Sequence, residues 1–416
     1  MADIFISYSR DDSEFVRKLV DSLETAGRNV WVDFNDIPFA AKWLDEIIEA
    51  IENTPTGIFV ISPTSIESQY CSLEITQLFQ NRKKLVPIVI VRPDEGTVEK
   101  LPQNVRDLNW IFFDNDDFDG AFQNLIDAID TDIEASKKHT RLLVNALEWQ
   151  RRGHSKDNLL RGDELADFLP MLESDSLIPV QQAYLELSLS AAQARYNFWR
   201  FMFGFLGSFL AMGYYALATW RGTISPVAIV IALGIGEIFG FFTGLIAVFG
   251  SALPEFVKKR VPPVIYNPVR IAVCVLAGML GWMVYQWLFL NLGFVPTWAA
   301  LLGGVAMSAG FIVNTLFKPP SYLTFLLTGV LFYVAIFFLN PVNGVMSDIG
   351  IVEPLIYFDT IDQVYWVGAI MALVYAAGTN AHLMWQAFFG ENRVTRFLEG
   401  RPIRRKRKRG LEPANA

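Results

Sequence analysis

Hydrophobic and polar positions divide the chain into two halves of different character. Over the first 132 residues, short apolar runs alternate with stretches whose apolar positions recur at helical spacing. Strands are predicted over residues 4–7, 30–33, 57–62, 85–91 and 110–113, and helices over 11–25, 43–52 and 118–132. Strands of nearly continuous hydrophobicity separated by helices predict a parallel sheet that is covered by helices on both faces.

The second half holds six apolar segments that are long enough to cross a bilayer, which takes about 20 residues. They lie near residues 200–220, 227–253, 271–292, 298–317, 322–339 and 364–389. Backbone groups in lipid must be satisfied within their own segment, so these segments are predicted to be helices. Between the two halves, residues 133–197 are predicted to form a helical linker. Its last helix is expected to begin at Pro179 and to run unbroken into the first span.

Charged side chains are also unevenly distributed. Residues 1–200 contain 34 acidic and 20 basic side chains, whereas residues 201–416 contain 9 acidic and 15 basic ones. In the second half, basic side chains gather in the loop 254–270 and in the C-terminal tail, while the loop 340–363 has no Lys or Arg. Loops rich in Lys and Arg stay on the cytoplasmic side of a membrane. Six spans therefore predict a multi-pass protein of the cell membrane, with the N-terminal half and the tail in the cytoplasm.

The rest of the composition argues against several kinds of site. The two cysteines, Cys71 and Cys274, fall in different halves, so no structural disulfide is expected. The three histidines lie far apart in sequence and lack metal-ligand spacing, which argues against a metal site. Neither a GxGxxG fingerprint nor a P-loop is found, which disfavours a Rossmann cofactor and an ATPase. We expect no nucleic-acid partner.

The strand ends of the predicted sheet identify where a ligand would bind. In parallel sheets of this kind, ligands bind in the crevice beyond the carboxyl ends of the strands. Three segments should meet at this edge, namely residues 7–10, 33–42 and 62–65. Ser62 and Ser65 are equally suited to cap the helix that follows them.

Several ordered motifs carry a resemblance to a known family. They read DIFISYSRDD at 3–12, VWVD at 30–33 with DIP at 36–38 and Trp43, SPTSIESQYCSLE at 62–74, and NWIFF at 109–113. In this order they resemble the first box, the BB loop, the S-x-x-[WY]-C-x-x-E motif and the third box of the TIR (Toll/interleukin-1 receptor) family. The resemblance implies a flavodoxin-like α/β fold with a five-stranded parallel sheet. Residues 133–197 resemble the helical extension that follows TIR domains in some bacterial membrane-anchored proteins.

Many bacterial TIR domains cleave the bond between nicotinamide and ribose, so the resemblance implies an NAD glycohydrolase. NAD would be the substrate, and no cofactor or metal is required. A carboxylate beside the ribose can stabilise the positive charge that develops as nicotinamide leaves. The motif assigns this catalytic role to Glu74, and substrate contacts are expected from Ser7, Arg10, Asp33 and Trp43.

The BB loop departs from the family pattern and keeps a second function open. A Gly usually follows the Pro closely, but this chain reads PFAA at 38–41, and Ala adopts a positive φ less readily than Gly. The alternative to an enzyme is a non-enzymatic TIR adaptor that transmits signals by recruiting other TIR domains at the membrane.

The second span contains a carboxyl group and a glycine repeat. Glu237 lies near the middle of the span, where ionisable side chains are expensive and often functional, so a channel or transporter is a third candidate function. The structural alternative is a protonated Glu237 hydrogen-bonded to Asn291, Asn314 or His382. Glycines recur every four residues at positions 236, 240 and 244, and this spacing predicts close packing against another helix.

Together these expectations divide the chain into four parts. They are a TIR domain over 1–132, a helical linker over 133–197, a transmembrane domain of about six helices over 198–390, and a basic cytoplasmic tail over 391–416. TIR domains usually act after self-association, so the expected partners are NAD, further copies of the chain and the lipid bilayer. The expected role is that of an effector in signalling or bacterial defence.

Overall fold

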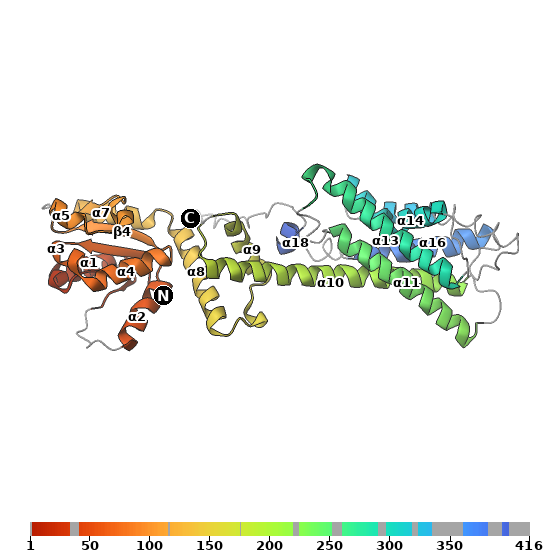
Figure 1. The fold of residues 1–416 in the computed structure, drawn as a ribbon, viewed down its shortest axis with the longest axis horizontal. Coiled ribbons are helices and arrows are strands. Elements are labelled where there is room, and N and C mark those ends of the chain that lie inside the picture. Colours follow the sequence, from red (N-terminus) through yellow and green to blue (C-terminus); the bar gives the residue numbers. More distant parts are fainter. Residues whose placement is uncertain are drawn as a thin grey trace, which may run out of the picture. The chain divides into compact units, whose positions relative to one another are not determined.

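The computed structural model describes most of the chain, and its residues form two compact units. The described residues are 2–33, 41–114, 117–174, 176–218, 224–251, 260–289, 297–317, 323–334, 361–381 and 393–398. The units are Met1–Leu189, called the α/β unit below, and Ser190–Ala416, called the helical unit. Figure 1 labels most of their helices and the strand β4.

The α/β unit is built on a five-stranded parallel sheet, as predicted. Its strands are β1 (Ile4–Ser7), β2 (Val30–Trp31), β3 (Thr56–Ile61), β4 (Lys84–Val89) and β5 (Ile111–Phe112). They lie in the order β2-β1-β3-β4-β5, and all neighbouring pairs are parallel. The outer strands β2 and β5 are shorter than the predicted runs, because each has a neighbour on one side only.

Among the described residues, six helices and one 3-10 turn lie between the strands, and a seventh helix follows the last strand. They are η1 (Arg10–Asp12), α1 (Ser13–Thr25), α2 (Ala41–Asn53), α3 (Pro63–Glu67), α4 (Gln69–Gln80), α5 (Glu95–Val98), α6 (Gln103–Arg106) and α7 (Phe118–Asp130). Successive side chains of a strand point to opposite faces of the sheet. Accordingly, Ile4 and Ile6 pack with buried residues of α1 and α7, whereas Phe5 packs with those of α2 and α4. The buried strands and amphipathic helices thus form one core on each face of the sheet.

A helical linker completes the α/β unit. It contains α8 (Ile133–Arg151), η2 (Lys156–Asn158), α9 (Gly162–Phe168), η3 (Leu169–Glu173) and the start of α10 (Pro179–Ala218). Helix α10 begins at Pro179 and continues for 40 residues without a break, as the sequence predicts. Near its start, the Gln181 side-chain amide donates a hydrogen bond of 3.0 Å to the carbonyl of His139 on α8.

Lys83 joins helix α8 to the rest of the α/β unit. Its ammonium group is buried, and it donates to the Glu52 carbonyl (2.7 Å) at the end of α2 and to the Thr140 hydroxyl (3.0 Å) on α8. Burial lowers the pKa of Lys83 to about 7, while Glu52 raises it in part. Arg151 of α8 pairs with the Glu52 carboxylate at 2.6 Å. The linker is therefore packed on the same helix that follows the predicted BB loop.

The helical unit consists of apolar helices. They include the rest of α10, α11 (Pro226–Ser251), α13 (Tyr266–Phe289), α14 (Thr297–Phe317), α16 (Ile361–Thr379) and the short α18 (Arg393–Leu398), with the turn η4 (Pro263–Ile265) before α13. Within the described residues, three helices are long and apolar enough to cross a membrane, namely Pro179–Ala218, Pro226–Gly250 and Tyr266–Tyr285. Shorter apolar helices are described over Ala300–Val313, Leu323–Val334 and Trp366–Thr379. Each of these six helices overlaps one of the six predicted apolar segments, although the first three begin before their segments and parts of the segments lie outside the described residues.

Phenylalanines of α10 pack into the glycine repeat of α11. Gly236, Gly240 and Gly244 face Phe209, Phe205 and Phe201, respectively. A methyl group on Gly240 would lie 2.9 Å from the Phe205 carbonyl oxygen, so the helix backbones approach as closely as glycine permits. The phenylalanine rings also stack on one another, with centroids 6.2 Å apart for Phe201 and Phe205. The glycine spacing therefore serves helix packing, as predicted.

Glu237 follows the first of these glycines but lies on the exposed side of α11. The hydrogen-bond partners expected for it, namely the side chains of Asn291, Asn314 and His382, lie outside those that the structure describes. Among the described residues, Glu237 therefore lies on the outer surface of the helices rather than inside their bundle.

We expect Gly240→Ala to destabilise the helical unit, because the added methyl group would press on the α10 backbone. Overpacking of this kind costs about 1–3 kcal/mol. Gly213→Ala in α10 is the matched control, since its methyl group would have its nearest neighbour at 3.7 Å. Ala also favours a helix over Gly by about 1 kcal/mol. Thermal unfolding of the full chain in detergent should show a lower midpoint for Gly240→Ala and an equal or higher one for Gly213→Ala. Equal midpoints for the two variants would contradict the packing.

Candidate active site

A pocket lies beyond the carboxyl ends of β1 and β2, beside the first half of α4. It has a volume of about 240 Å³ and is lined by Ile6, Tyr8, Ser9, Arg10, Trp31, Asp33, Ser68, Tyr70 and Glu74. Strand order reverses between β1 and β3, and the crevice at such a point is the common ligand site of open α/β sheets. The fold thus brings polar and aromatic side chains from three separate chain segments to one place.

Hydrogen bonds join the segments that follow β1 and β3. The Ser62 hydroxyl donates to the Asp12 carboxylate at 2.6 Å. Ser62 also caps α3 by accepting from the Ser65 amide, and the Ser65 hydroxyl accepts from the Ser62 amide. This reciprocal capping box fixes the start of α3. The capping role expected for Ser62 and Ser65 is confirmed, and neither residue lines the pocket.

Glu74 reaches the pocket because of its position on α4. The helix begins after Ser68, whose hydroxyl accepts from the Cys71 amide at 3.4 Å. Cys71, Ile75 and Leu78 form the buried stripe of α4 against the sheet. Residues three and four apart on a helix share a face, so Glu74 lies beside Cys71 and Leu78 at the edge of this stripe. Its side chain is partly exposed, toward the pocket.

The surroundings of the Glu74 carboxyl group favour its protonated form. Burial is the main cause and raises the pKa of Glu74 to about 7. The nearby Asp33 carboxylate raises this pKa further, whereas the Ser7 hydroxyl lowers it. Ser7 is buried and forms no hydrogen bond of ordinary geometry, so its hydroxyl remains available to the carboxylate next to it. Both the neutral and the ionised forms of Glu74 are therefore populated near neutral pH.

Tyr8 links the ends of β1 and β2 across the pocket. Its hydroxyl donates a hydrogen bond of 2.8 Å to the Asp33 carbonyl. Burial, and after it the Asp33 carboxylate, raises the pKa of Tyr8, so this phenol remains a donor at neutral pH. The bond holds Asp33 at the pocket although β2 ends at Trp31.

Aromatic rings provide the apolar walls. Trp31 stacks on the buried Phe5 ring with centroids 5.0 Å apart and an interplanar angle of 10°, which fixes its orientation. The Tyr70 side chain is 47% exposed at the mouth of the pocket. Planar rings of this kind offer stacking surfaces to a flat heterocycle. Within the described residues, no group of three His, Cys, Asp or Glu side chains comes together as a metal site.

The pocket contains only part of the set of residues expected from sequence. Glu74, Arg10 and Asp33 line it, whereas Ser7 is buried beneath it. The side chain of Trp43 lies outside those that the structure describes.

Tyr8 and Ser9 also line the pocket and belong to the segment 7–10 that was expected at this edge, although no role was assigned to them. Four further lining residues lie outside the expected segments: Ile6, Trp31, Ser68 and Tyr70. Trp31 ends its strand, and Ser68 and Tyr70 belong to the motif that ends at Glu74, so strand-end position was the signal that could have identified Trp31.

Comparison with known proteins identifies the domain. The family model described as "TIR domain" matches residues 4–126. Residues 4–126 form a TIR domain. They include all five strands and most of the helices that cover the sheet.

Proteins similar to this TIR domain include a receptor and two enzymes. Mouse Toll-like receptor 2 is 31% identical over 116 residues, which cover 26% of this chain and 14% of the receptor. The 2′ cyclic ADP-D-ribose synthase AbTIR of Acinetobacter baumannii is 30% identical over 91 residues, which cover 21% of this chain and 34% of that protein. The probable 2′ cyclic ADP-D-ribose synthase BdTIR of Brachypodium distachyon is 28% identical over 108 residues, which cover 25% of this chain and 47% of that protein. This chain thus spans less than half the length of each of these relatives.

The raised pKa of Glu74 predicts a pH-dependent difference in stability between the wild type and Glu74→Gln. The unfolded chain loses this proton near the ordinary Glu pKa, and the folded chain loses it near pH 7. The wild type therefore loses stability as the pH rises through this window, by at most about 3 kcal/mol. Glu74→Gln lacks this loss of stability. The difference in thermal midpoint between Glu74→Gln and the wild type should therefore shift in favour of the variant from pH 5 to pH 8.

The exposed Glu14 on α1 provides the control for this measurement. Glu14→Gln should show the same difference from the wild type at both pH values. A Glu74→Gln difference that does not change between pH 5 and pH 8 would show that the carboxyl is solvated in the folded protein.

Proposed function

We propose that this chain is a membrane-anchored NAD glycohydrolase whose TIR domain cleaves the nicotinamide–ribose bond with Glu74 as the catalytic carboxylate. The observation that carries the proposal is the position of Glu74. It is the pocket residue whose carboxyl group is withdrawn from water at the strand-end crevice, with aromatic and polar side chains around it. The similarity to two 2′ cyclic ADP-D-ribose synthases supports the choice of NAD as the substrate.

The reaction would proceed by departure of nicotinamide. The bond between the ribose C1′ and the pyridinium nitrogen breaks, its electron pair stays on nicotinamide, and the ribose becomes an oxocarbenium-like cation. The ionised Glu74 carboxylate stabilises this cation and orients the ribose hydroxyls. Water attacks C1′ and releases a proton to give ADP-ribose, or a hydroxyl of the same molecule attacks to give a cyclic product. A poorly solvated carboxylate acts more strongly on the developing charge than one in bulk water.

The other pocket residues would bind the substrate. The faces of Trp31 and Tyr70 suit a planar base. The Arg10 guanidinium suits the diphosphate, because guanidinium groups bind phosphate oxygens in pairs. The Asp33 carboxylate can accept from a ribose hydroxyl, and the Ser7 hydroxyl holds the orientation of Glu74. Trp43 keeps the substrate contact expected for it from sequence.

The decisive experiment measures nicotinamide release from NAD by the purified full chain. Glu74→Gln keeps the shape of the side chain but removes its charge, so release should fall by about 100-fold or more, as for loss of a group that stabilises transition-state charge. Glu14→Gln is the control, because it removes a carboxylate that is exposed and does not line the pocket. It should leave the rate unchanged.

The same measurement separates the enzyme from the adaptor. If the assembled wild-type protein releases no nicotinamide, or if Glu74→Gln releases it at the wild-type rate, the catalytic assignment is wrong. A TIR adaptor, which acts by binding other TIR domains, would then be the better description.

We further propose that the helical unit crosses the membrane six times and keeps the TIR domain in the cytoplasm. The three long apolar helices support membrane insertion, and the basic loop 254–270 supports the orientation. Under this proposal the chain is of the bacterial membrane-anchored type and acts as a signalling or defence effector. Its TIR domains associate with those of further copies, and the anchor concentrates them on one surface.

The proposed topology predicts which loops a membrane-impermeant maleimide reaches in intact cells. The native Cys71 and Cys274 are buried, so they should contribute little maleimide labelling of their own. Ser347→Cys, in the acidic loop, should be labelled from outside, whereas Val257→Cys, in the basic loop, should be labelled only after the cells are permeabilised. Labelling of Val257→Cys in intact cells would reverse the orientation, and labelling of both loops from the same side would rule out six spans.

A further inference from the structure

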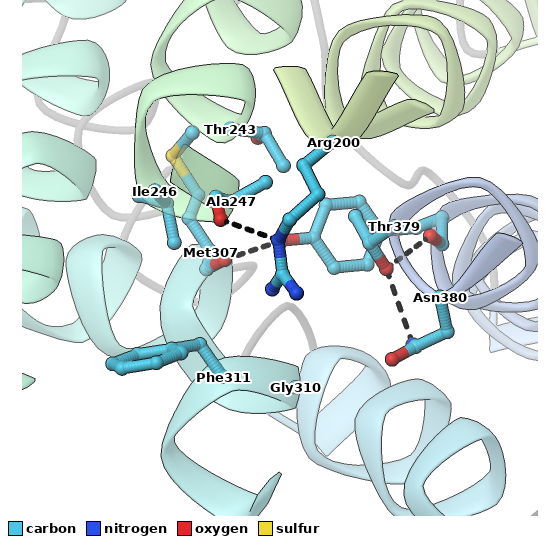
Figure 2. A pocket seen from close by; sticks show the side chains of 10 residues that line it. Arg200, Thr243, Ile246, Ala247, Met307, Gly310, Phe311, Thr379 and Asn380 are labelled. Atoms are coloured by element: carbon cyan, nitrogen blue, oxygen red, sulfur yellow. Dashed lines mark hydrogen bonds between the residues drawn. The ribbon is translucent and has the colours of Figure 1, made fainter. Parts of the chain in front are cut away.

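A small cavity with several polar side chains in a mainly apolar lining lies among the helices of the helical unit. It is bounded by α10, α11, α14 and α16, and its polar lining includes Arg200, Thr243, Tyr375, Thr379 and Asn380. Figure 2 shows the Arg200 guanidinium near the centre of this ring of residues. A guanidinium within an apolar helix bundle is costly unless a partner offsets its charge.

The contacts of Arg200 leave much of its hydrogen-bonding capacity unused. Its Nε donates to the Ala247 carbonyl at 2.9 Å, and one terminal nitrogen donates to the Tyr196 hydroxyl at 2.8 Å. A guanidinium has five N–H donors, and the others form no hydrogen bond with a described residue. Within the described part of the chain, no Asp or Glu pairs with Arg200.

A second arginine adds positive charge next to the cavity. Arg270 of α13 donates to the Gly250 carbonyl and, at 3.2 Å, to the Asn267 side chain. Its guanidinium lies 5.2 Å from the ring centroid of Phe311, a residue that lines the cavity. Arg270 and Arg200 lie within electrostatic range of each other. Both arginines bond carbonyls near the end of α11, which is a favourable place for cations. That role accounts for one donor group of each, and no Asp or Glu among the described residues pairs with either arginine.

The cavity lining also contains the buried hydroxyl of Thr243. Thr243 is 2% exposed, and its hydroxyl oxygen forms no hydrogen bond of ordinary geometry in the structure. The hydroxyls of Tyr375 and Thr379 are already engaged, since they donate to the carbonyls of Met307 and Tyr375. Among the described lining residues, Arg200 and Thr243 therefore supply donors that no hydrogen bond of ordinary geometry engages, although the Thr243 hydroxyl lies close to that of Tyr375 (Figure 2).

The volume of the cavity and its position along the membrane helices restrict which ligands could bind in it. Its volume of about 40 Å³ corresponds to about three water-sized groups, so this partly open cavity can enclose most of a tetrahedral oxyanion but not a nucleotide. Just before Arg200 on α10, Phe198 and Trp199 are each 57% exposed. Exposed aromatic side chains of this kind mark the interface of a bilayer, where lipid phosphates lie.

We propose that this cavity binds a phosphate group, with Arg200 and the Thr243 hydroxyl as its donors. The group is either the headgroup of an anionic lipid or free inorganic phosphate. In both cases the anion offsets the charge of Arg200 and accepts its unused N–H donors in the fork geometry that guanidinium groups offer to phosphate. Basic pockets between membrane helices bind lipid headgroups in the same way.

The test is calorimetric titration of the purified, delipidated full chain in an uncharged detergent. One arm uses inorganic phosphate, and the other uses short-chain dihexanoyl phosphatidylglycerol. Saturable binding of the lipid alone identifies a headgroup site, and saturable binding of phosphate identifies a free-anion site. Arg200→Gln should raise the Kd of the bound probe about tenfold or more, because it removes charge-assisted hydrogen bonds.

Arg195→Gln is the matched control, since Arg195 lies on the same helix but is exposed and does not line the cavity. It removes the same charge and should change the Kd by less than about twofold if binding is specific. The proposal is overturned if the wild type binds neither probe saturably, or if Arg195→Gln weakens binding as much as Arg200→Gln.

Thr243→Val keeps the test decisive if Arg200→Gln fails to fold. Removing an unpaired buried hydroxyl should leave the thermal midpoint of the ligand-free protein unchanged or raise it. The same change should raise the Kd several-fold, because one donor to the anion is lost. A folding defect would lower the midpoint together with the affinity, so the two effects are separable. An unchanged Kd in a stable Thr243→Val protein would overturn the assignment of the cavity.

Discussion

An ionised side chain loses several kcal/mol of hydration when protein surrounds it, and suitable partners restore only part of that loss. Three side chains in this chain illustrate the consequences. Burial shifts the Glu74 and Lys83 equilibria toward their neutral forms, because neither group has an ion-pair partner strong enough to offset desolvation. No Asp or Glu among the described residues pairs with Arg200, and in our proposal a bound anion balances its charge. The candidate site, the linker contact and the anion cavity follow from the same constraint.

The parallel sheet determines where the first of these groups can be placed. Because helices cover both faces of the sheet, polar side chains can gather only beyond the ends of its strands. Tyr8 and Asp33 follow β1 and β2 at this edge and line the pocket. Helix α4 must keep Cys71, Ile75 and Leu78 against the sheet. This packing leaves Glu74 at the border between core and pocket, so the stability of the fold and the acidity of the candidate catalytic group depend on the same helix.

The fold was predictable from sequence because its signals are local and periodic. Neighbouring residues alone predicted the strand at 4–7 and the start of α10 at Pro179. The glycine repeat of α11 likewise predicted a helix-packing face. The site was predictable only in part, because it depends on contacts between distant segments. Tyr8 enters the pocket through its bond to the Asp33 carbonyl, 25 residues away. The sequence did not predict a binding role for Arg200, because an arginine at the start of a predicted span is an ordinary boundary residue.

The linker is structurally part of the α/β unit, and this affects how the TIR domain could respond to events elsewhere in the chain. Gln181 of α10 holds the His139 carbonyl of α8. Helix α8 in turn contacts Lys83 and pairs Arg151 with Glu52 at the end of α2. Helix α2 follows directly on the segment that resembles the BB loop. A change in α10 near Gln181 would therefore act first on α8 and α2, through hydrogen bonds and one ion pair. The pKa of Lys83 is about 7, so its protonation changes near neutral pH. Only the charged ammonium group forms charge-assisted bonds to the α2 carbonyl and the α8 hydroxyl, so the contact between α2 and α8 weakens when Lys83 loses its proton.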